Sequence, residues 1–317
     1  MAHFQNRSEY RNEKNVKEES NFIKASWYLC DCLQLSDATS ISSKYVPTTN
    51  ISGILPDLVI KSSDSILFHV HTKVLNSISS NHFGGYGTPS HSAVTALEDS
   101  KILTIVLDII YRNPNAAIDF APPFPFDQLA SAISRLPVYG VDPQVQLDSN
   151  ASNAATAHPI YRALLAHATP HALELYILAA QHKMESLAVA ASTYLVGFHI
   201  ADLNDEQAEA MGPRYLRRLI LMQSRRESML KRILLQPPYP HPSTPDCDVL
   251  DQKMLTKAWT LCAAYFVWDI RADLPSAALE NLLGPLAGHV SCELCKRLIR
   301  EQVTKIVGEW EAVKGTI

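Results

Sequence analysis

Four residues in the C-terminal third of the chain have the chemistry of a zinc site. They are His241, Cys247, Cys292 and Cys295. Zinc prefers four soft or borderline ligands in a tetrahedron, and one histidine with three cysteines is a common structural set. The Cys292-x-x-Cys295 spacing puts two thiols one helical turn apart, and a proline-rich loop could supply the other two ligands. The pattern predicts a structural zinc ion as cofactor, in a closed site with no open position for a substrate.

The same cysteines also fit a buried apolar stripe. Residues at seven-residue intervals continue it along the last predicted helix: Cys292, Ile299, Ile306 and Val313. Cys295 stands four residues before Ile299, and free cysteine often packs as a small apolar side chain. The interval from Cys247 to Cys292 is also longer than in compact zinc modules. Zinc ligation and core packing therefore both stay open, while a redox Cys-x-x-Cys is less favoured because no βαβ pattern surrounds it.

Other cysteines and histidines are weaker candidates for a metal site. Cys30 and Cys32 form a Cys-Asp-Cys pair near the N-terminus, where unpaired thiols are the favoured interpretation. His69 and His71 share one face of a predicted strand. A packed histidine at a strand-to-helix junction is favoured there over a metal pair. We expect His71 to hydrogen-bond the backbone or Asp57 in a structural role.

A predicted helix between Arg214 and Arg232 carries a cluster of basic residues. They are Arg217, Arg218, Arg225, Arg226 and Lys231. Such a face could bind nucleic acid or an acidic partner. No aromatic residues are interleaved with these basic residues, which favours a solvated helix surface over a binding face. A DNA-associated transcriptional regulator is therefore an alternative function, and nucleic acid is not the expected partner.

Sequence motifs of catalysis are absent. The chain has no G-x-S-x-G elbow, no Walker loop and no His-Glu-x-x-His. Gly84-Gly-Tyr-Gly87 lacks the Lys-Ser/Thr that would make it a phosphate loop, and it is typical of a turn. We expect that the protein is not an enzyme. An unrecognised enzyme stays as an alternative, because spatial triads do not show in one sequence.

Length and composition are those of an ordinary globular protein. The chain has 317 residues, of which 47% are hydrophobic and 19% charged, with a net charge of -4 and six cysteines. These values suggest about two domains, argue against a disulfide scaffold and provide no overall basic field for nucleic acid or membrane. The chain shows no signal-peptide pattern and no apolar run of membrane-spanning length. We expect a soluble intracellular protein, in the cytoplasm or nucleus, without membrane partners.

The hydrophobic pattern predicts an α+β fold, in which a small sheet capped by helices precedes an all-helical domain. Three short strands are expected, at 57–60, 66–70 and 94–97. The first two should form a hairpin through the polar turn 62–65. Helices of this half are expected at 72–79, 100–111 and 127–136.

The rest of the chain is expected to be helical after a loop at 142–168. Thr169 should cap a helix that has Pro170 in its first turn. Later helices are expected at 213–235, 251–268 and 291–313, the second with Met254, Ala258, Leu261, Cys262 and Tyr265 on one face. The expected domains are a lead-in at 1–50, an α+β domain at 51–200 and a helical domain at 201–317.

Residues 56–83 resemble a BTB/POZ domain. The matching positions are Asp57, Phe68, His71, Leu75, Ser79 and Phe83. In that family an Asp-initiated strand opens a hairpin, and a Phe-x-x-His step leads into a helix that carries the leucine and the Ser…Phe positions. Two features depart from the family. Thr72 stands where members often carry a basic residue that pairs with the strand aspartate, and the loop after Phe83 lacks the usual Met-Phe.

The C-terminal half is similar to the region that follows such domains in many basidiomycete fungal proteins. The matching pieces are 242–247, 257–259, 291–295 and 309–314. The whole resemblance covers about residues 55–317 and implies protein–protein interaction as the function. BTB/POZ modules commonly dimerise, and many recruit cullin-type ubiquitin ligases or act in transcription. The resemblance thus implies a dimeric adaptor whose partners are itself and a cullin-type scaffold.

Overall fold

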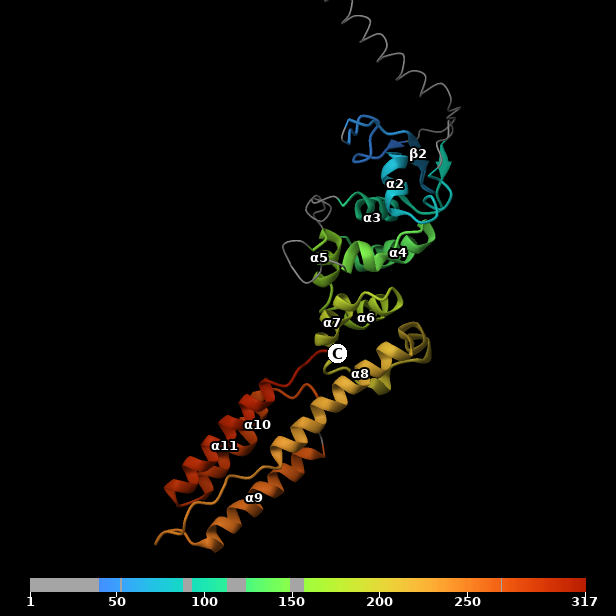
Figure 1. Ribbon diagram of the computed structural model, residues 1–317. Helices are drawn as coiled ribbons and strands as arrows, with labels where there is room; N and C mark the ends of the chain where they lie inside the picture. The colour runs from blue at the N-terminus through green and yellow to red at the C-terminus, as the bar shows by residue number, and fades with distance from the viewer. Residues whose placement is uncertain (1–39, 52, 88–92, 113–123, 149–156, 269) are drawn as a thin grey trace, which may run out of the picture. The chain divides into compact units, whose positions relative to one another are not determined.

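The computed structural model describes residues 40–51, 53–87, 93–112, 124–148, 157–268 and 270–317 (Figure 1). The chain divides into two compact units, Met1–Gln146 and Leu147–Ile317. The first unit contains a small sheet, and most of the remaining described chain is helical. The α+β class predicted from the sequence is therefore confirmed at this coarse level. No helix in the described ranges combines the length and the apolar character that a membrane crossing requires.

Four short strands form the sheet of the first unit. They are β1 Ser40–Ile41, β2 Leu58–Lys61, β3 Ile66–Val70 and β4 Val94–Thr95. Their order is β1-β3-β2-β4, with β2 and β3 antiparallel and each outer strand parallel to its neighbour. The Ser62 hydroxyl closes the hairpin by accepting the Ile66 N–H at 3.0 Å, as expected of a short polar side chain in a turn. The predicted hairpin is confirmed.

Three α-helices follow in the same unit. They are α2 Thr72–Ile78, α3 Ser100–Tyr111 and α4 Phe126–Arg135. Each begins and ends within one residue of its predicted bounds. Asp99 caps α3 by accepting the Ile102 N–H at 2.8 Å, and the nearly all-round apolar helix behind that cap is buried from Ile105 to Ile110. The buried Asp108 carboxylate within it accepts the Tyr45 hydroxyl at 2.8 Å.

The hairpin leads directly into α2, and its motif residues form a core. Phe68, Leu75 and Phe83 are all buried. The Phe83 ring stacks on Tyr139 with ring centroids 4.3 Å apart. Ser79 ends α2, and its hydroxyl accepts the Phe83 N–H at 2.6 Å. The apolar positions that carry the sequence motif are thus buried positions.

The second unit contains seven α-helices among its described residues. They are α5 Pro159–Ala166, α6 Ala172–Gln181, α7 Glu185–Ser192, α8 Asp205–Leu234, α9 Val249–Val267, α10 Ser276–Leu283 and α11 Glu293–Glu311. Helix α5 lies inside the stretch predicted as a loop, so that prediction was wrong. The helix has only eight residues and buries Ile160, Tyr161 and Leu164, a pattern too short to stand out as periodicity.

One predicted helix start needs correction. Helix α6 begins at Ala172 without a side-chain cap from its N-cap residue, after a turn closed by the bond from His171 N–H to the His167 carbonyl. Helix α8 consists of two helices that meet at a kink at Gly212: the first, which was not predicted, begins at Asp205 with a capping box between Asn204 and Gln207, and the second begins at Pro213 as predicted. The first two turns of α8 are too polar to show an apolar stripe. Gly212, with φ of 72°, separates them from the predicted part.

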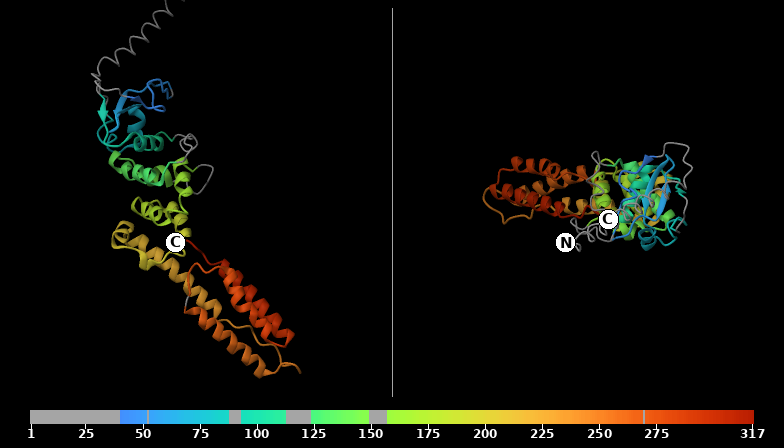
Figure 2. Two further views of the ribbon diagram at one scale, coloured as in Figure 1. Left: turned by 180° about the vertical axis from the view of Figure 1, so that it is seen from behind. Right: turned by 90° about the horizontal axis from the view of Figure 1, so that it is seen from above.

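The second part of α8 shares one apolar core with α9, α10 and α11, and these helices run alongside one another (Figures 1 and 2). Its fully buried members include Leu234, Trp259, Leu283 and Ile299. The Trp259 indole N–H donates to the Leu234 carbonyl at 3.0 Å, which satisfies the one polar atom of this buried ring. This core positions the ends of the helices where the predicted metal ligands lie.

Candidate functional site

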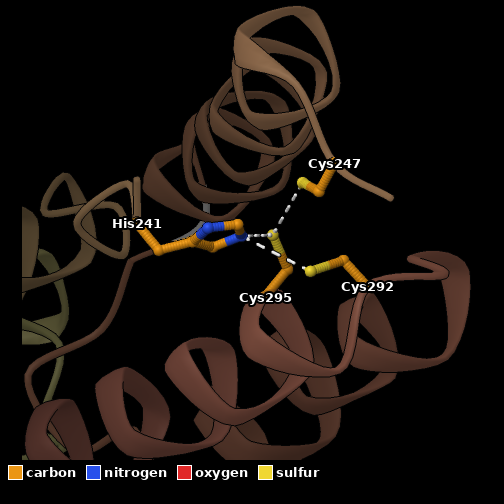
Figure 3. A group of neighbouring side chains, drawn as sticks. All are labelled: His241, Cys247, Cys292 and Cys295. Carbon is orange, nitrogen blue, oxygen red and sulfur yellow. Dashed lines mark hydrogen bonds between the residues drawn. The ribbon is translucent and has the colours of Figure 1, made fainter. Parts of the chain in front are cut away.

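The structure brings the four predicted zinc ligands together in the second unit (Figure 3). We call His241, Cys247, Cys292 and Cys295 the His/Cys cluster. The Cys247 and Cys295 sulfur atoms lie 3.7 Å apart. His241 Nε2 lies 3.4 Å from Cys292 Sγ and 3.3 Å from Cys295 Sγ, and all four ligand atoms lie within 4.8 Å of one another. A cluster of this kind could hold a metal ion such as zinc.

Three of the six ligand–ligand distances in the cluster match the edges of a zinc tetrahedron. Zinc–sulfur bonds of about 2.3 Å and zinc–nitrogen bonds of about 2.0 Å place two sulfur ligands about 3.8 Å apart and a nitrogen and a sulfur about 3.5 Å apart. The observed separations of 3.7, 3.4 and 3.3 Å agree with this geometry. A disulfide needs sulfur atoms about 2.05 Å apart, so Cys247 and Cys295 are free thiols.

Two helix starts position the three sulfur ligands. Cys247 closes a tight turn with Thr244, in which each backbone N–H donates to the other residue's carbonyl. Asp248 follows as N-cap of α9, in a capping box with Asp251. Cys292 is the N-cap residue of α11, and Cys295 lies in the first turn of that helix. The cluster therefore connects the start of α9, the loop before it and the start of α11.

The His241 ring is oriented for ligation through Nε2. Its Nδ1 lies 2.7 Å from the Pro242 carbonyl oxygen, to which an Nδ1–H would donate. That bond leaves the Nε2 lone pair toward the sulfurs of Cys292 and Cys295. A second-shell bond to a carbonyl is the usual way in which proteins fix the tautomer of a metal-ligating histidine.

The pKa values of the three thiols diverge. Backbone N–H groups of Cys295 and Leu294, at the start of α11, lower the pKa of Cys292 to about 7. Burial, followed by the neighbouring Cys247 sulfur, raises the pKa of Cys295 to about 12. Burial also raises the pKa of Cys247. Three thiolates cannot share this space without a cation, and a bound divalent metal would supply the missing positive charge.

The apolar stripe along α11 is also present. Ile299 and Ile306 are buried in the core that α11 shares with the other helices, and Val313 packs against it. Cys295 is buried too, but its sulfur faces Cys247 and His241 at the end of that stripe. Core packing and metal ligation therefore use successive turns of one helix, and the two sequence interpretations do not exclude each other.

A hollow of about 310 Å³ borders the cluster. Its wall is built from α9, from the segment before α11 and from the sulfur ligands, and includes Asp251, Met254, Leu255, Ala258, Leu286 and His289. The wall combines apolar side chains with the carboxylate of Asp251 and the ring of His289. The hollow is of a size that suits one large side chain of a partner.

Helix α9 carries apolar side chains on two opposite faces. Its inner face packs into the core through Trp259 and Ala263. We call the other set of large side chains the outer stripe, and it consists of Leu250, Met254, Leu261, Tyr265 and Trp268. Tyr265 is 79% exposed and Trp268 is 91% exposed. The sequence pattern had identified part of this set as one apolar face of the helix, and the structure shows that this face points outward.

The histidine candidates of the predicted strand belong to the first unit. His71 is buried, and its ring nitrogens lie 3.1 Å from the Tyr111 hydroxyl and 3.2 Å from the Ile54 carbonyl. This agrees with the structural, backbone-bonded role expected for it, although its partner is not Asp57. Cys30 and Cys32 lie outside the described residues.

Two arginines of the predicted basic helix have partners within the second unit. Arg218 forms an ion pair with Glu185 at 2.5 Å. The Arg226 Nε donates to the Ala272 carbonyl at 2.7 Å. Arg217 and Arg225 are exposed. The five basic residues therefore do not form one free basic face.

No family model, curated protein or solved structure matches the chain. The geometry of the His/Cys cluster and the outer stripe of α9 therefore carry the functional argument.

Proposed function

We propose that the chain is a protein–protein interaction protein of the BTB/POZ kind, in which one structural zinc ion holds the C-terminal helices in place. The observation that carries the zinc proposal is the gathering of all four ligand atoms within 4.8 Å of one another, with two nitrogen–sulfur distances and one sulfur–sulfur distance from 3.3 to 3.7 Å. A set of three cysteines and one histidine fills all four positions of the metal. The role of the ion is therefore structural, and it leaves no place for a substrate.

The zinc ion would link parts of the chain that are far apart in sequence. Each cysteine ligand is anchored on backbone with its own fixed geometry, at a tight turn before α9 or at the start of α11. The bound set of three thiolates and one Zn²⁺ carries one net negative charge, and the N-terminus of α11 stabilises negative charge beside it. Zinc binding would add its free energy to the stability of this helical arrangement.

The interaction role is supported by the outer stripe of α9. An apolar helix face in a globular protein is normally covered. Among the described residues, α9 is covered on its inner face only, while the outer stripe stays exposed. The segment that resembles BTB/POZ domains supports the same role, because its motif residues Phe68, Leu75 and Phe83 are all buried. The partner classes that the resemblance implies are a second copy and a cullin-type scaffold.

Metal analysis of the purified chain tests the zinc proposal. We expect about one zinc per chain in the native protein, and much less than one in Cys292→Ser and Cys295→Ser variants. Cys262→Ser is the matched control, because Cys262 lies on α9 away from the cluster and should leave the zinc content unchanged. A native protein that is purified without chelators, stays folded and contains no zinc, even after zinc is added, would end the proposal.

Direct binding tests the adaptor proposal. Light scattering should show a species heavier than one chain, and calorimetry should detect binding to a purified cullin-type scaffold. Binding that depends on the outer stripe should weaken in Leu261→Glu and persist in Thr256→Glu, whose site is exposed on another side of α9. A strictly monomeric chain that binds no such scaffold would contradict the adaptor role while leaving the zinc result untouched.

A further inference from the structure

We propose that a second copy of this chain covers the outer stripe of α9, in an antiparallel pairing of the two α9 helices about a two-fold axis. The inference deepens the proposed interaction function by naming the surface and its occupant, and it rests on that function. The outer stripe begins at Leu250 and ends at Trp268, so it extends along the whole helix.

The spacing of the stripe suits helix-to-helix pairing. Its five members are separated by four, seven, four and three residues, which keeps them on one side of a helix. From Met254 on, with Ala258 included, the steps are four, three, four and three. That alternation is the heptad spacing of a coiled-coil seam, whose side chains pack into the gaps of a facing helix.

The two ends of the stripe are complementary to each other. The hollow of about 310 Å³ lies beside its first half, with Met254 and Ala258 in the wall. The two most exposed members of the stripe, Tyr265 and Trp268, lie at its other end. Asp251 in the wall of the hollow offers a carboxylate acceptor for the hydroxyl of a tyrosine. One helix therefore carries both a projecting aromatic pair and a recess, at opposite ends.

A two-fold axis near the middle of α9 joins these ends in pairs. In the antiparallel arrangement Met254 of one copy faces Tyr265 of the other, and Leu250 faces Trp268. Each copy then inserts its aromatic end beside the recess of the other, so the same contact forms twice. Aromatic side chains seated in recesses are the usual source of binding energy in interfaces.

The exposed area is sufficient for a specific dimer. Two aromatic side chains of about 200 Å² each and three aliphatic ones of about half that size would together bury about 700 Å² per copy. Two copies would bury about 1,400 Å², which lies toward the lower end of specific interfaces. We expect a dissociation constant in the micromolar range, which corresponds to a binding free energy of about −8 kcal/mol.

Charge does not oppose the pairing. Lys253 and Lys257 flank the stripe in its first half, while the second half, from Thr260 to Trp268, carries no charged side chain. Antiparallel pairing places the lysines of one copy beside Tyr265 and Leu261 of the other, and their ammonium groups can reach water past these side chains. A tyrosine ring also attracts an ammonium group near its face. Parallel pairing would instead bring lysine against lysine.

Sedimentation equilibrium of the full zinc-loaded chain tests the dimer. We expect the native chain to dimerise, and Leu261→Glu and Trp268→Ala to raise the dissociation constant at least about 30-fold, as expected for the loss of a side chain that carries much of the binding energy. Thr256→Glu is the matched control, since it adds the same charge to an exposed site of α9 outside the stripe. It should leave the dissociation constant unchanged, and circular dichroism should show that all variants fold.

Cross-linking tests the direction of pairing. Mixing Met254→Cys chains with Tyr265→Cys chains under mild oxidation should give the mixed disulfide dimer in excess over either homodimer. Predominant Met254→Cys homodimers would indicate parallel pairing and overturn the antiparallel arrangement.

Three other results would overturn the inference. The first is a native chain that stays monomeric at about 200 µM, far above the expected dissociation constant. The second is a dimer that Leu261→Glu leaves intact. The third is a dimer that Thr256→Glu disrupts as strongly as Leu261→Glu does. Zinc is measured on the same samples. A zinc-loaded monomer that binds a cullin-type scaffold would sink the dimer alone, whereas a metal-free dimer would sink only the zinc proposal.

Discussion

The Arg226 guanidinium lies 4.3 Å from the centre of the Trp310 indole ring, and the two residues hold three segments of the helical unit together. Arg226 donates to the Ala272 carbonyl at 2.7 Å and to the Val313 carbonyl at 2.6 Å. The Trp310 indole N–H donates to the Leu274 carbonyl at 2.8 Å. Arg226 thus connects α8 to the segment before α10 and to the end of α11, and its role is structural.

Replacing this arginine should destabilise the helical unit. Arg226→Met keeps the length of the side chain but removes two charge-assisted hydrogen bonds and the contact of the cation with the ring. We expect the free energy of unfolding to fall by about 2 kcal/mol, a value that allows for the hydrogen bonds that the freed carbonyls make to water. Arg225→Met is the matched control, because Arg225 is exposed, and it should change stability by less than about 0.5 kcal/mol. Urea denaturation measures both, and equal effects of the two changes would contradict the structural role.

Zinc removal should lower the melting temperature of the chain. When the free zinc concentration is a thousandfold above the dissociation constant, zinc binding adds about 4 kcal/mol to the free energy of unfolding. For a folding unit of the size of Leu147–Ile317 that corresponds to a drop of about 8–16 °C when a chelator strips the metal. Thermal unfolding followed by circular dichroism, with and without chelator, checks this. The Cys295→Ser variant should melt at the same temperature under both conditions, and a chelator effect on it would point to a different site.

Zinc affinity should fall as the pH falls. The pKa of Cys247 and Cys295 is raised by burial, so both thiols hold protons at neutral pH, and zinc has to displace them. Displacement of two protons raises the dissociation constant about a hundredfold for each pH unit of acidification. Competition with a chromogenic chelator at pH 6, 7 and 8 measures it. A dissociation constant that does not change over this range would show that thiols of raised pKa do not bind the metal.

The bond between Thr72 and Asp57 should stabilise the first unit. The Asp57 carboxylate accepts the Thr72 backbone N–H at 2.7 Å and also its hydroxyl. Thr72→Val removes the hydroxyl donor at nearly constant volume, and we expect it to cost about 1–2 kcal/mol, since hydrogen bonds to charged groups are the stronger ones. Thr72→Ser keeps the donor and should recover most of this loss. Equilibrium unfolding in urea distinguishes them, and equal losses would assign the effect to the methyl group.

Alkaline pH should destabilise the first unit through its buried tyrosines. Burial raises the pKa of Tyr111 to about 12 and raises the pKa of Tyr45 and Tyr139 as well. The folded chain keeps these protons where the unfolded chain releases them, so the stability is fully present below pH 10 and is lost as the pH rises toward 12. We expect the free energy of unfolding to fall by about 1 kcal/mol for each buried tyrosine by pH 11. Urea denaturation at pH 8, 10 and 11 measures it, with tyrosinate absorbance as the second readout. Unchanged stability, or formation of tyrosinate by all twelve tyrosines near pH 10 in the folded chain, would contradict it.

The sequence alone determined the elements that depend on neighbouring residues. The polar turn at 62–65 and the alternating residues around it specify the hairpin, and the Thr72–Ile78 helix follows from local spacing. It also selected the four metal-ligand candidates, because zinc chemistry restricts the residue types. Helix α5 was missed because eight residues give too little periodicity against a background of alanine and asparagine.

Only the tertiary structure decided which of these residues meet. Cys247 and Cys295 lie 48 residues apart in sequence and 3.7 Å apart in space, because α9 and α11 begin beside each other in a shared core. The tertiary structure likewise decided which apolar face of α9 is covered, since both faces have the same period and differ only in what packs against them. Local backbone preferences set the helices and strands, whereas the packing of distant segments set the cluster and the exposed stripe.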